Sequence, residues 1–294
     1  MDPSHPLRRA LPLVLAAGVC FATLDATAKW LIQEHALFLV IWARYTGQAL
    51  VVTPIAWSRG GHGFWRTRHL KMQLARSLCL VSATACFFGG LRYLPLAEGS
   101  AIAFLAPMFA ILLSGPVLGE KPTRARWLSA FGGFVGILML VRPGTAVFHP
   151  ATLFLVGAAI SNALYQLLTR RLPRDGPYTT LFYTALVGAV VLTAMLPFSG
   201  VTVPLGWTDA AFLVTLGVLA GVGHWIFITA FLMAPASLLA PFTYVQMVWA
   251  TFYGWLVFGH LPDGLSALGM AVIVGSGVAL VVHERRRIAR APMQ

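Results

Sequence analysis

Three charged side chains lie inside long apolar stretches near the N-terminus, where they could bind a charged group or neutralise one another. Asp25 and Lys29 are four residues apart, so they share one face of a helix. Arg44 lies in the next apolar stretch, and Gln48 is one helical turn beyond it. If these stretches form antiparallel helices, Asp25 and Arg44 come to similar depths. They would then anchor a ligand carboxylate or form a structural ion pair between two helices.

Two further stretches place amides and aromatic rings on single helical faces. In the stretch 150–169, the spacing i, i+3, i+4, i+7 is occupied by Asn162, Tyr165, Gln166 and Thr169. In the stretch 236–259, helical spacing connects Phe242, Gln246, Trp249 and Tyr253. Amides and phenols hydrogen-bond the polar part of a small molecule, and aromatic rings pack against its apolar part. The alternative is hydrogen bonding between helices, which uses the same residue types.

Three single residues inside apolar stretches add one ring nitrogen, from His224, and two breaks in helical hydrogen bonding, at Pro107 and Pro241. His224 shares one side of its stretch with two glycines, and we include it in the expected cavity lining, with packing as the alternative. Pro107 and Pro241 cannot donate a helical hydrogen bond. We expect a kink or loosened turn at each, serving as a hinge. Mere tolerance of proline in membrane helices is the alternative.

Sequence motifs for metal binding, catalysis and ATP use are missing. Cys20, Cys79 and Cys86 form no CxxC pair and no cluster with histidine. The chain contains no HExxH, GxSxG or P-loop sequence, which argues against a membrane-embedded enzyme and against direct ATP drive. No segment resembles an ion-selectivity filter. We therefore expect no enzyme activity, no metal and no cofactor.

The composition indicates that membrane-spanning helices carry these residues. Of the 294 residues, 58% are hydrophobic and only 10% are charged, whereas soluble domains have about 45–50% apolar and about 25% charged residues. A soluble enzyme is thereby excluded. Spanning helices need about 20 apolar residues. The sequence predicts an all-α polytopic membrane protein with ten spans: 11–31, 36–57, 72–92, 95–118, 125–142, 150–169, 179–197, 208–232, 236–259 and 264–283.

The basic residues predict the orientation of these spans. With the N-terminus in the cytoplasm, 16 of the 21 Lys and Arg residues fall on the cytoplasmic side, as the positive-inside rule requires. Both termini are then predicted to be cytoplasmic. The net charge of +12 follows from this topology and from contact with lipid headgroups, so we expect no nucleic-acid partner.

The two halves of the chain resemble each other. Leu128-Ser129-Ala130-Phe131-Gly132 matches Leu265-Ser266-Ala267-Leu268-Gly269, and Leu118-Gly119-Glu120-Lys121-Pro122 pairs with Phe258-Gly259-His260-Leu261-Pro262. We therefore predict two five-helix repeats, residues 1–146 and 147–294. An odd number of spans per repeat gives the two repeats opposite orientations. Inverted repeats around a central cavity are typical of transporters.

The chain resembles the drug/metabolite transporter superfamily in its ten-helix EamA form. The resemblance is carried by Lys29, Arg44, the run Tyr93-Leu94-Pro95-Leu96-Ala97-Glu98-Gly99-Ser100-Ala101 and the run Leu118-Gly119-Glu120-Lys121-Pro122. Within that superfamily the chain looks most like the YddG-type aromatic amino acid exporters. One departure is His260, because the family often has an acidic residue at this point of the second repeat.

This resemblance implies a secondary transporter in a bacterial inner membrane. It implies export of amino acids, with aromatic and other neutral ones preferred, by alternating access of a central cavity. Export of drugs or other small metabolites is the alternative. The expected partners are the amino acid and the lipid bilayer, and the oligomeric state stays open.

Overall fold

The computed structural model describes residues 5–119, 123–144, 148–172, 175–201, 206–234, 239 and 242–290. Every regular element in this part of the chain is helical. The helices are α1 (His5–Glu34), α2 (Leu37–Gly60), α3 (Leu70–Leu91), α4 (Leu96–Ala103), α5 (Ala106–Leu118), α6 (Arg124–Val141), α7 (Thr152–Arg170), α8 (Pro177–Met195), the 3-10 turn η1 (Leu196–Phe198), α9 (Trp207–Met233), α11 (Val245–Phe258) and α12 (Gly264–Arg290).

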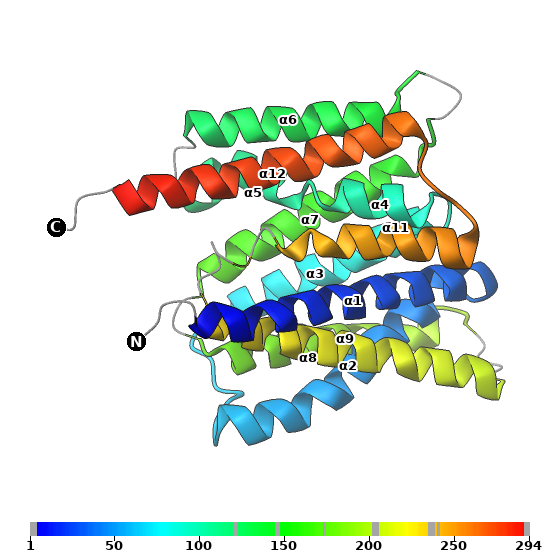
Figure 1. Ribbon diagram of the computed structural model, residues 1–294. Helices are drawn as coiled ribbons and strands as arrows, with labels where there is room; N and C mark the ends of the chain where they lie inside the picture. The colour runs from blue at the N-terminus through cyan, green and yellow to red at the C-terminus, as the bar shows by residue number, and fades with distance from the viewer. Residues whose placement is uncertain are drawn as a thin grey trace.

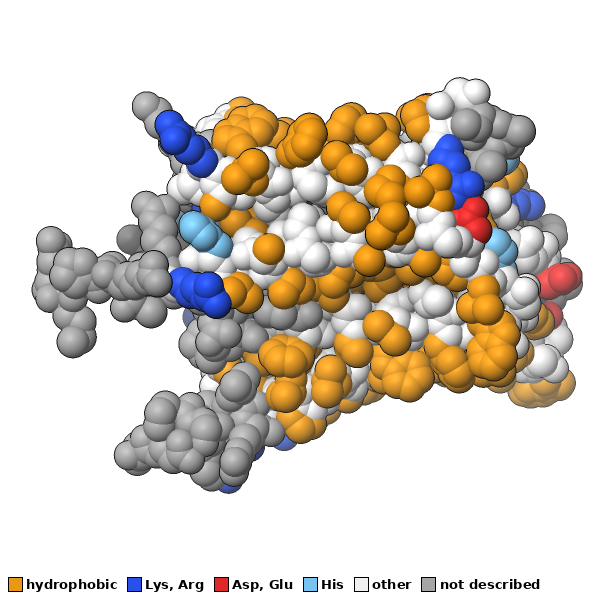
Figure 2. Space-filling view, turned by 45° about the horizontal axis from the view of Figure 1, so that its top comes forward, with side chains coloured by type: hydrophobic (Ala, Val, Ile, Leu, Met, Phe, Trp, Pro, Cys, Tyr) orange, Lys and Arg blue, Asp and Glu red, His pale blue; other side chains and the backbone are white. Residues whose placement is uncertain are grey.

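The length and surface of these helices are those of a membrane protein. Among the described residues, nine segments are long and apolar enough to cross a bilayer, with α4 and α5 together forming one of them. The tenth predicted span, 236–259, is represented there by the shorter apolar helix α11. Hydrophobic side chains cover the side of the bundle, and charged side chains gather at its two ends (Figure 2). The predicted all-α polytopic fold is confirmed.

The helices run side by side in one bundle (Figure 1). Helix α6 lies along α12, α1 lies along α9, and α3 lies along α7. The His5 end of α1 and the Arg290 end of α12 lie at the same end of the bundle, which we call the terminal end. The opposite end, where α1 turns into α2, is called the far end.

The span predicted over 95–118 is interrupted in its middle. Helix α4 stops at Ala103, and α5 begins at Ala106 after Phe104 and Leu105. Pro107 lies in the first turn of α5, where the N–H group that it lacks would have no helical partner. The helix is thus interrupted at the place where the sequence predicts a loosened turn. Pro241, the other expected hinge, lies outside the described residues.

Small residues bring helices from distant parts of the sequence into close contact. A Cβ atom on Gly47 of α2 would lie 2.6 Å from the Cα atom of Gly217 in α9. A Cβ atom on Gly136 of α6 would lie 2.7 Å from the carbonyl oxygen of Gly269 in α12. Since no side chain larger than hydrogen fits at these points, glycine sets the helix spacing.

Matching positions in the two halves end their helices in the same way. Helix α5 ends at Gly119 with φ 72°, and α11 ends at Gly259 with φ 65°. Both values lie in the left-handed region, which glycine adopts without a Cβ clash. The sequence match of Leu118-Gly119 with Phe258-Gly259 therefore corresponds to one shared local structure.

Candidate functional site

A cavity of about 1010 Å³ opens inside the helix bundle. Its lining includes Asp175 in the connection between α7 and α8, which lies at the terminal end. Along α8 and α9 the lining residues fall in the halves nearer to that end, namely 177–184 and 224–231. The far-end residues Lys29 and His260 do not line it. The cavity therefore extends from the middle of the bundle to the terminal end.

Most of the site residues expected from the sequence meet in this cavity. The lining contains Asp25, Arg44, Asn162, Tyr165, Gln166, His224 and Gln246, together with Pro107. Gln48, Trp249 and Tyr253, which were expected in the same cavity, do not line it in this structure. Gln48 is fully buried on α2, beside the close contact with Gly217 of α9.

The two aromatic residues of α11 contact other parts of the protein instead of the cavity, and one of them, Tyr253, contacts α1. The Tyr253 hydroxyl lies 2.9 Å from the Thr23 hydroxyl, so this face of α11 contacts α1. The Trp249 ring packs against Phe252 and Tyr253. Helical spacing correctly groups these residues with Gln246, but only the first turn of α11 reaches the cavity.

Asp25 and Arg44 face the same cavity without forming a direct ion pair among the described contacts. Asp25 is 7% exposed and accepts a hydrogen bond of 3.1 Å from the Gln246 side-chain amide. Arg44 is 6% exposed, and its guanidinium lies 4.6 Å from the centre of the Tyr45 ring. Its Nε and Nη1 atoms have no hydrogen-bond partner among the described residues. Asp25 and Arg44 thus form no direct pair among the described contacts, and two of the three Arg44 guanidinium nitrogens are enclosed by protein.

A second cavity arginine, Arg76 of α3, differs because its donors are occupied. Its Nε donates to the Thr169 hydroxyl at 2.9 Å, and its Nη1 donates to the Thr180 carbonyl and to Gln73 Oε1, both at 3.1 Å. The guanidinium also lies 4.6 Å from the centre of the Tyr165 ring. Arg76 thus ties α3 to α7 and α8. Arg76 is not among the site residues expected from the sequence. An arginine inside an apolar stretch does, however, indicate a residue that faces a cavity or a polar partner.

The network around Arg76 ends on a carboxylate. Asp175 accepts a hydrogen bond of 2.7 Å from the Gln73 side-chain amide and one of 2.6 Å from the Thr67 hydroxyl. Since Gln73 also accepts from Arg76, it links the positive and the negative group. This network fixes the cavity wall at the terminal end.

The polar face of α7 offers free amides to the cavity. Asn162 and Gln166 both line it, and neither side chain forms a hydrogen bond to another described residue. Each carries one acceptor and one donor group. The Ser100 hydroxyl, on α4, is also buried without a described partner at the cavity wall. These groups can bind a molecule with both acceptors and donors.

Aromatic rings form the apolar parts of the cavity wall. Phe21 of α1 meets His224 edge to face at 4.9 Å and Phe227 at 6.0 Å. On another side Phe104, in the break between α4 and α5, lies 5.3 Å from Tyr244. His224 Nδ1 is 2.8 Å from the Ala220 carbonyl oxygen, which can only accept, so Nδ1 carries the proton. These rings suit a flat, partly apolar molecule.

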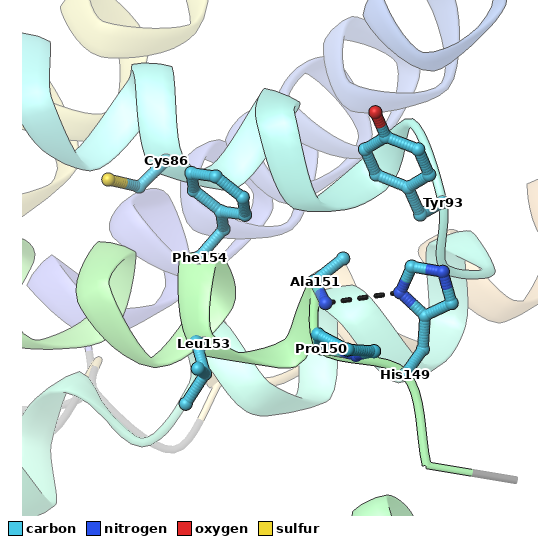
Figure 3. Close-up of a pocket in the computed structure, with 7 residues that line it drawn as sticks. All are labelled: Cys86, Tyr93, His149, Pro150, Ala151, Leu153 and Phe154. Carbon is cyan, nitrogen blue, oxygen red and sulfur yellow. Dashed lines mark hydrogen bonds between the residues drawn. The ribbon is translucent and has the colours of Figure 1, made fainter.

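A second hollow, of about 570 Å³, lies on the outside between α3 and α7 (Figure 3). Its walls are mainly apolar, and at one end the Tyr93 and His149 rings stack at 5.4 Å. The Ala151 N–H donates to His149 Nδ1 at 3.1 Å. Phe154 and Leu153 on its wall are exposed on the apolar flank of the bundle. The hollow therefore faces the bilayer and is separate from the polar cavity.

The central cavity has the features of a binding site rather than a catalytic one. Among the described residues no group of three His, Cys, Asp or Glu side chains is arranged to hold a metal ion. The cavity combines unused hydrogen-bonding groups with aromatic surface, which is how small organic molecules are bound.

The chain is similar to known proteins over nearly its whole length. The EamA-like transporter family matches residues 8–142 and 149–282. A riboflavin transporter of Vibrio cholerae is 30% identical, with 97% of each chain covered. An S-adenosylmethionine uptake transporter of Rickettsia felis is 26% identical, with 90% of each chain covered. A pseudopaline exporter of Pseudomonas aeruginosa is 28% identical over 71% of this chain and 74% of its own.

A solved crystal structure has the same fold, with a TM-score of 0.67 at 22% identity, and covers 95% of this chain and 99% of its own. None of the three relatives above is an amino acid exporter. The finer resemblance to the aromatic amino acid exporters, expected from the sequence, therefore has no support from them.

Proposed function

This chain belongs to the EamA-like transporter family, and from that premise we propose that it carries a planar heteroaromatic metabolite of the flavin type through its central cavity. Membership of the family makes the protein a secondary transporter of small metabolites and not an enzyme. Its relatives act on riboflavin, S-adenosylmethionine and pseudopaline, which favours metabolites larger than a free amino acid.

One observation supports the flavin proposal: amides without a described partner and aromatic rings line one cavity. A flavin ring system presents carbonyl acceptors and an N–H donor along one edge. Asn162 and Gln166 supply the complementary amide groups, and the Arg44 guanidinium supplies a further donor. The flat faces of the ring fit against Phe21 and Phe227. The cavity volume is at the upper end of what small-molecule sites occupy, roughly 300–1,000 Å³.

Transport requires that the cavity open first to one side of the membrane and then to the other. In this conformation the substrate enters from the terminal end, because the cavity reaches Asp175 there. We take both termini to be cytoplasmic, from the distribution of Lys and Arg, so this conformation is open to the inside. The two five-helix repeats then move relative to each other to open the far end.

The charges of the cavity favour a second candidate, a zwitterion that carries an α-amino acid group. Asp25 and Arg44 line the same cavity but do not neutralise each other directly. A substrate ammonium would bind near Asp25 and its carboxylate near Arg44. S-adenosylmethionine, the substrate named for the relative of Rickettsia felis, has this group, and so do the aromatic amino acids expected from the sequence.

The test is a transport panel in liposomes that contain the purified protein. Labelled riboflavin, S-adenosylmethionine and phenylalanine are compared, each with its unlabelled form inside to drive exchange. The flavin proposal predicts saturable riboflavin exchange that is reduced in Gln166→Leu and normal in Gln33→Leu, because Gln33 lies at the exposed end of α1. Exchange of only S-adenosylmethionine or phenylalanine would establish the zwitterion instead.

A further inference from the structure

The far end of the cavity is closed by a cluster of three ionisable side chains, Lys29, Glu98 and His260. Lys29 is 8% exposed, and its ammonium donates to the carbonyls of Leu91 at 2.6 Å and Leu94 at 2.7 Å. These carbonyls lie at the C-terminal end of α3, where they lack helical partners and attract a positive charge. Lys29 thus holds α1 to the end of α3.

Glu98 connects the two halves of the chain at this point. It lies in the first turn of α4, and its Oε1 accepts a hydrogen bond of 3.0 Å from His260 Nε2, in the segment after α11. Its Oε2 is buried without a hydrogen-bond partner among the described residues. The carboxylate of the first half therefore meets, at this point, a group of the second half that can be positive.

Helix α11 completes the closure by packing along α1 and α4. Thr23 and Tyr253 share a hydrogen bond of 2.9 Å, and the Lys29 ammonium lies 5.4 Å from the centre of the Phe258 ring. These contacts separate the end of the cavity, near Asp25, from the far end. Because the seam joins elements of both halves, it must open if the cavity is to reach the far side.

We propose that Glu98 is a proton-binding site, and that its protonation opens the far end. As a carboxylate, Glu98 accepts a charge-assisted hydrogen bond from His260. When Glu98 takes up a proton, its hydrogen bond to His260 loses the charge assistance and becomes weaker, so the contact that joins the two halves is loosened. The seam separates, and water reaches the cavity from the far side.

The elements packed against α4 are α1, α3, α7, α11 and α12, and they bring few titratable groups to the seam among the described residues. Helix α1 contributes Lys29 and, one turn nearer the cavity, Asp25, which accepts from Gln246 and not from a residue of the seam. Helix α11 contributes the Tyr253 hydroxyl and, just after its end, His260. The halves of α7 and α12 that lie at the far end, residues 152–164 and 264–282, contain no titratable residue. In α3, Cys86 faces the outer hollow, and Arg92 follows the helix at the surface.

This inference rests on the transport function of the family but not on the identity of the substrate, so it is tested without substrate. Nitroxide spin labels are attached to cysteines at Tyr93 and Leu256, two exposed far-end positions on opposite sides of the seam, after Cys20, Cys79 and Cys86 are replaced by alanine. Electron–electron double resonance then gives the distance distribution at pH 8 and at pH 4.5.

Acidification is expected to shift this distribution to longer distances in the otherwise unmodified protein. In Glu98→Gln the longer distances are expected at both pH values, because the amide mimics the protonated acid. His260→Gln is expected to keep the pH response, because the new amide still donates to Glu98 but does not titrate. Asp25→Asn and Asp263→Asn are expected to keep it too, since both carboxyls lie outside the cluster. A distribution that ignores pH, a response that persists in Glu98→Gln, or one lost in His260→Gln would each overturn the proposal.

Discussion

Arg44 provides the most informative single substitution in the cavity. Its Nε and Nη1 atoms are enclosed without a partner among the described residues, but the residue lines the cavity, so we expect the remaining guanidinium nitrogen, Nη2, to donate to bound substrate. Hydrogen bonds to a charged group contribute about 1.5–3 kcal/mol each. Loss of one such bond in Arg44→Gln raises the substrate dissociation constant about 10- to 100-fold. The fold itself is expected to survive, because Arg44 gives up only its contact with the Tyr45 ring and no hydrogen bond to a described residue.

The assay compares substrate affinity and thermal unfolding in Arg44→Gln and in the matched variant Arg76→Gln. Arg76 donates to Thr169, Gln73 and Thr180, so its loss is expected to lower Tm, with a cost of about 2 kcal/mol or more. Affinity is measured by the concentration dependence of exchange in liposomes. Unchanged affinity in Arg44→Gln, or a drop in Tm equal to that of Arg76→Gln, would refute the division into a binding arginine and a structural one.

Three further outcomes follow from contacts elsewhere in the bundle. Gly217→Val should lower Tm and folded yield, because the new side chain meets Gly47 of α2 and overpacking reduces the free energy of unfolding by about 1–3 kcal/mol. The control is Gly275→Val, since a Cβ atom at Gly275 meets nothing within 4 Å. Tyr165→Leu should lower Tm, because losing the ring beneath Arg76 reduces the free energy of unfolding by up to about 2 kcal/mol. Tyr165→Phe keeps the ring and should keep Tm. The Arg142 guanidinium holds the pKa of the Asp263 carboxyl below its usual range. That pair therefore stabilises the fold above the unfolded pKa of about 3.9 and is lost in acid, so Asp263→Asn should lower Tm at pH 7 but not under strongly acidic conditions.

Local periodicity was sufficient to predict part of the site. Asn162, Tyr165 and Gln166 lie on one helical face by their spacing, and that face does line the cavity. The break before Pro107 also has a purely local cause, since proline cannot donate within a helix. Such features depend on residues within one or two turns of each other, which a sequence displays directly.

Pairing between distant helices could not be predicted in the same way. Depth along the helices suggested that Asp25 would pair with Arg44, but Gln246, more than 200 residues away in the chain, takes that place. Trp249 has the correct spacing for the cavity face, yet α11 turns that face toward α1. The contact between Glu98 and His260 likewise depends on how the two halves pack, which no local pattern encodes.

The most direct test of the proposed function is a structure of the protein determined with riboflavin at saturating concentration. The proposal predicts density for the flavin ring in the central cavity, within hydrogen-bonding distance of Asn162 or Gln166, with a polar edge near the Arg44 guanidinium. An empty cavity under saturating riboflavin, or a ring bound only on the outer surface, would contradict it.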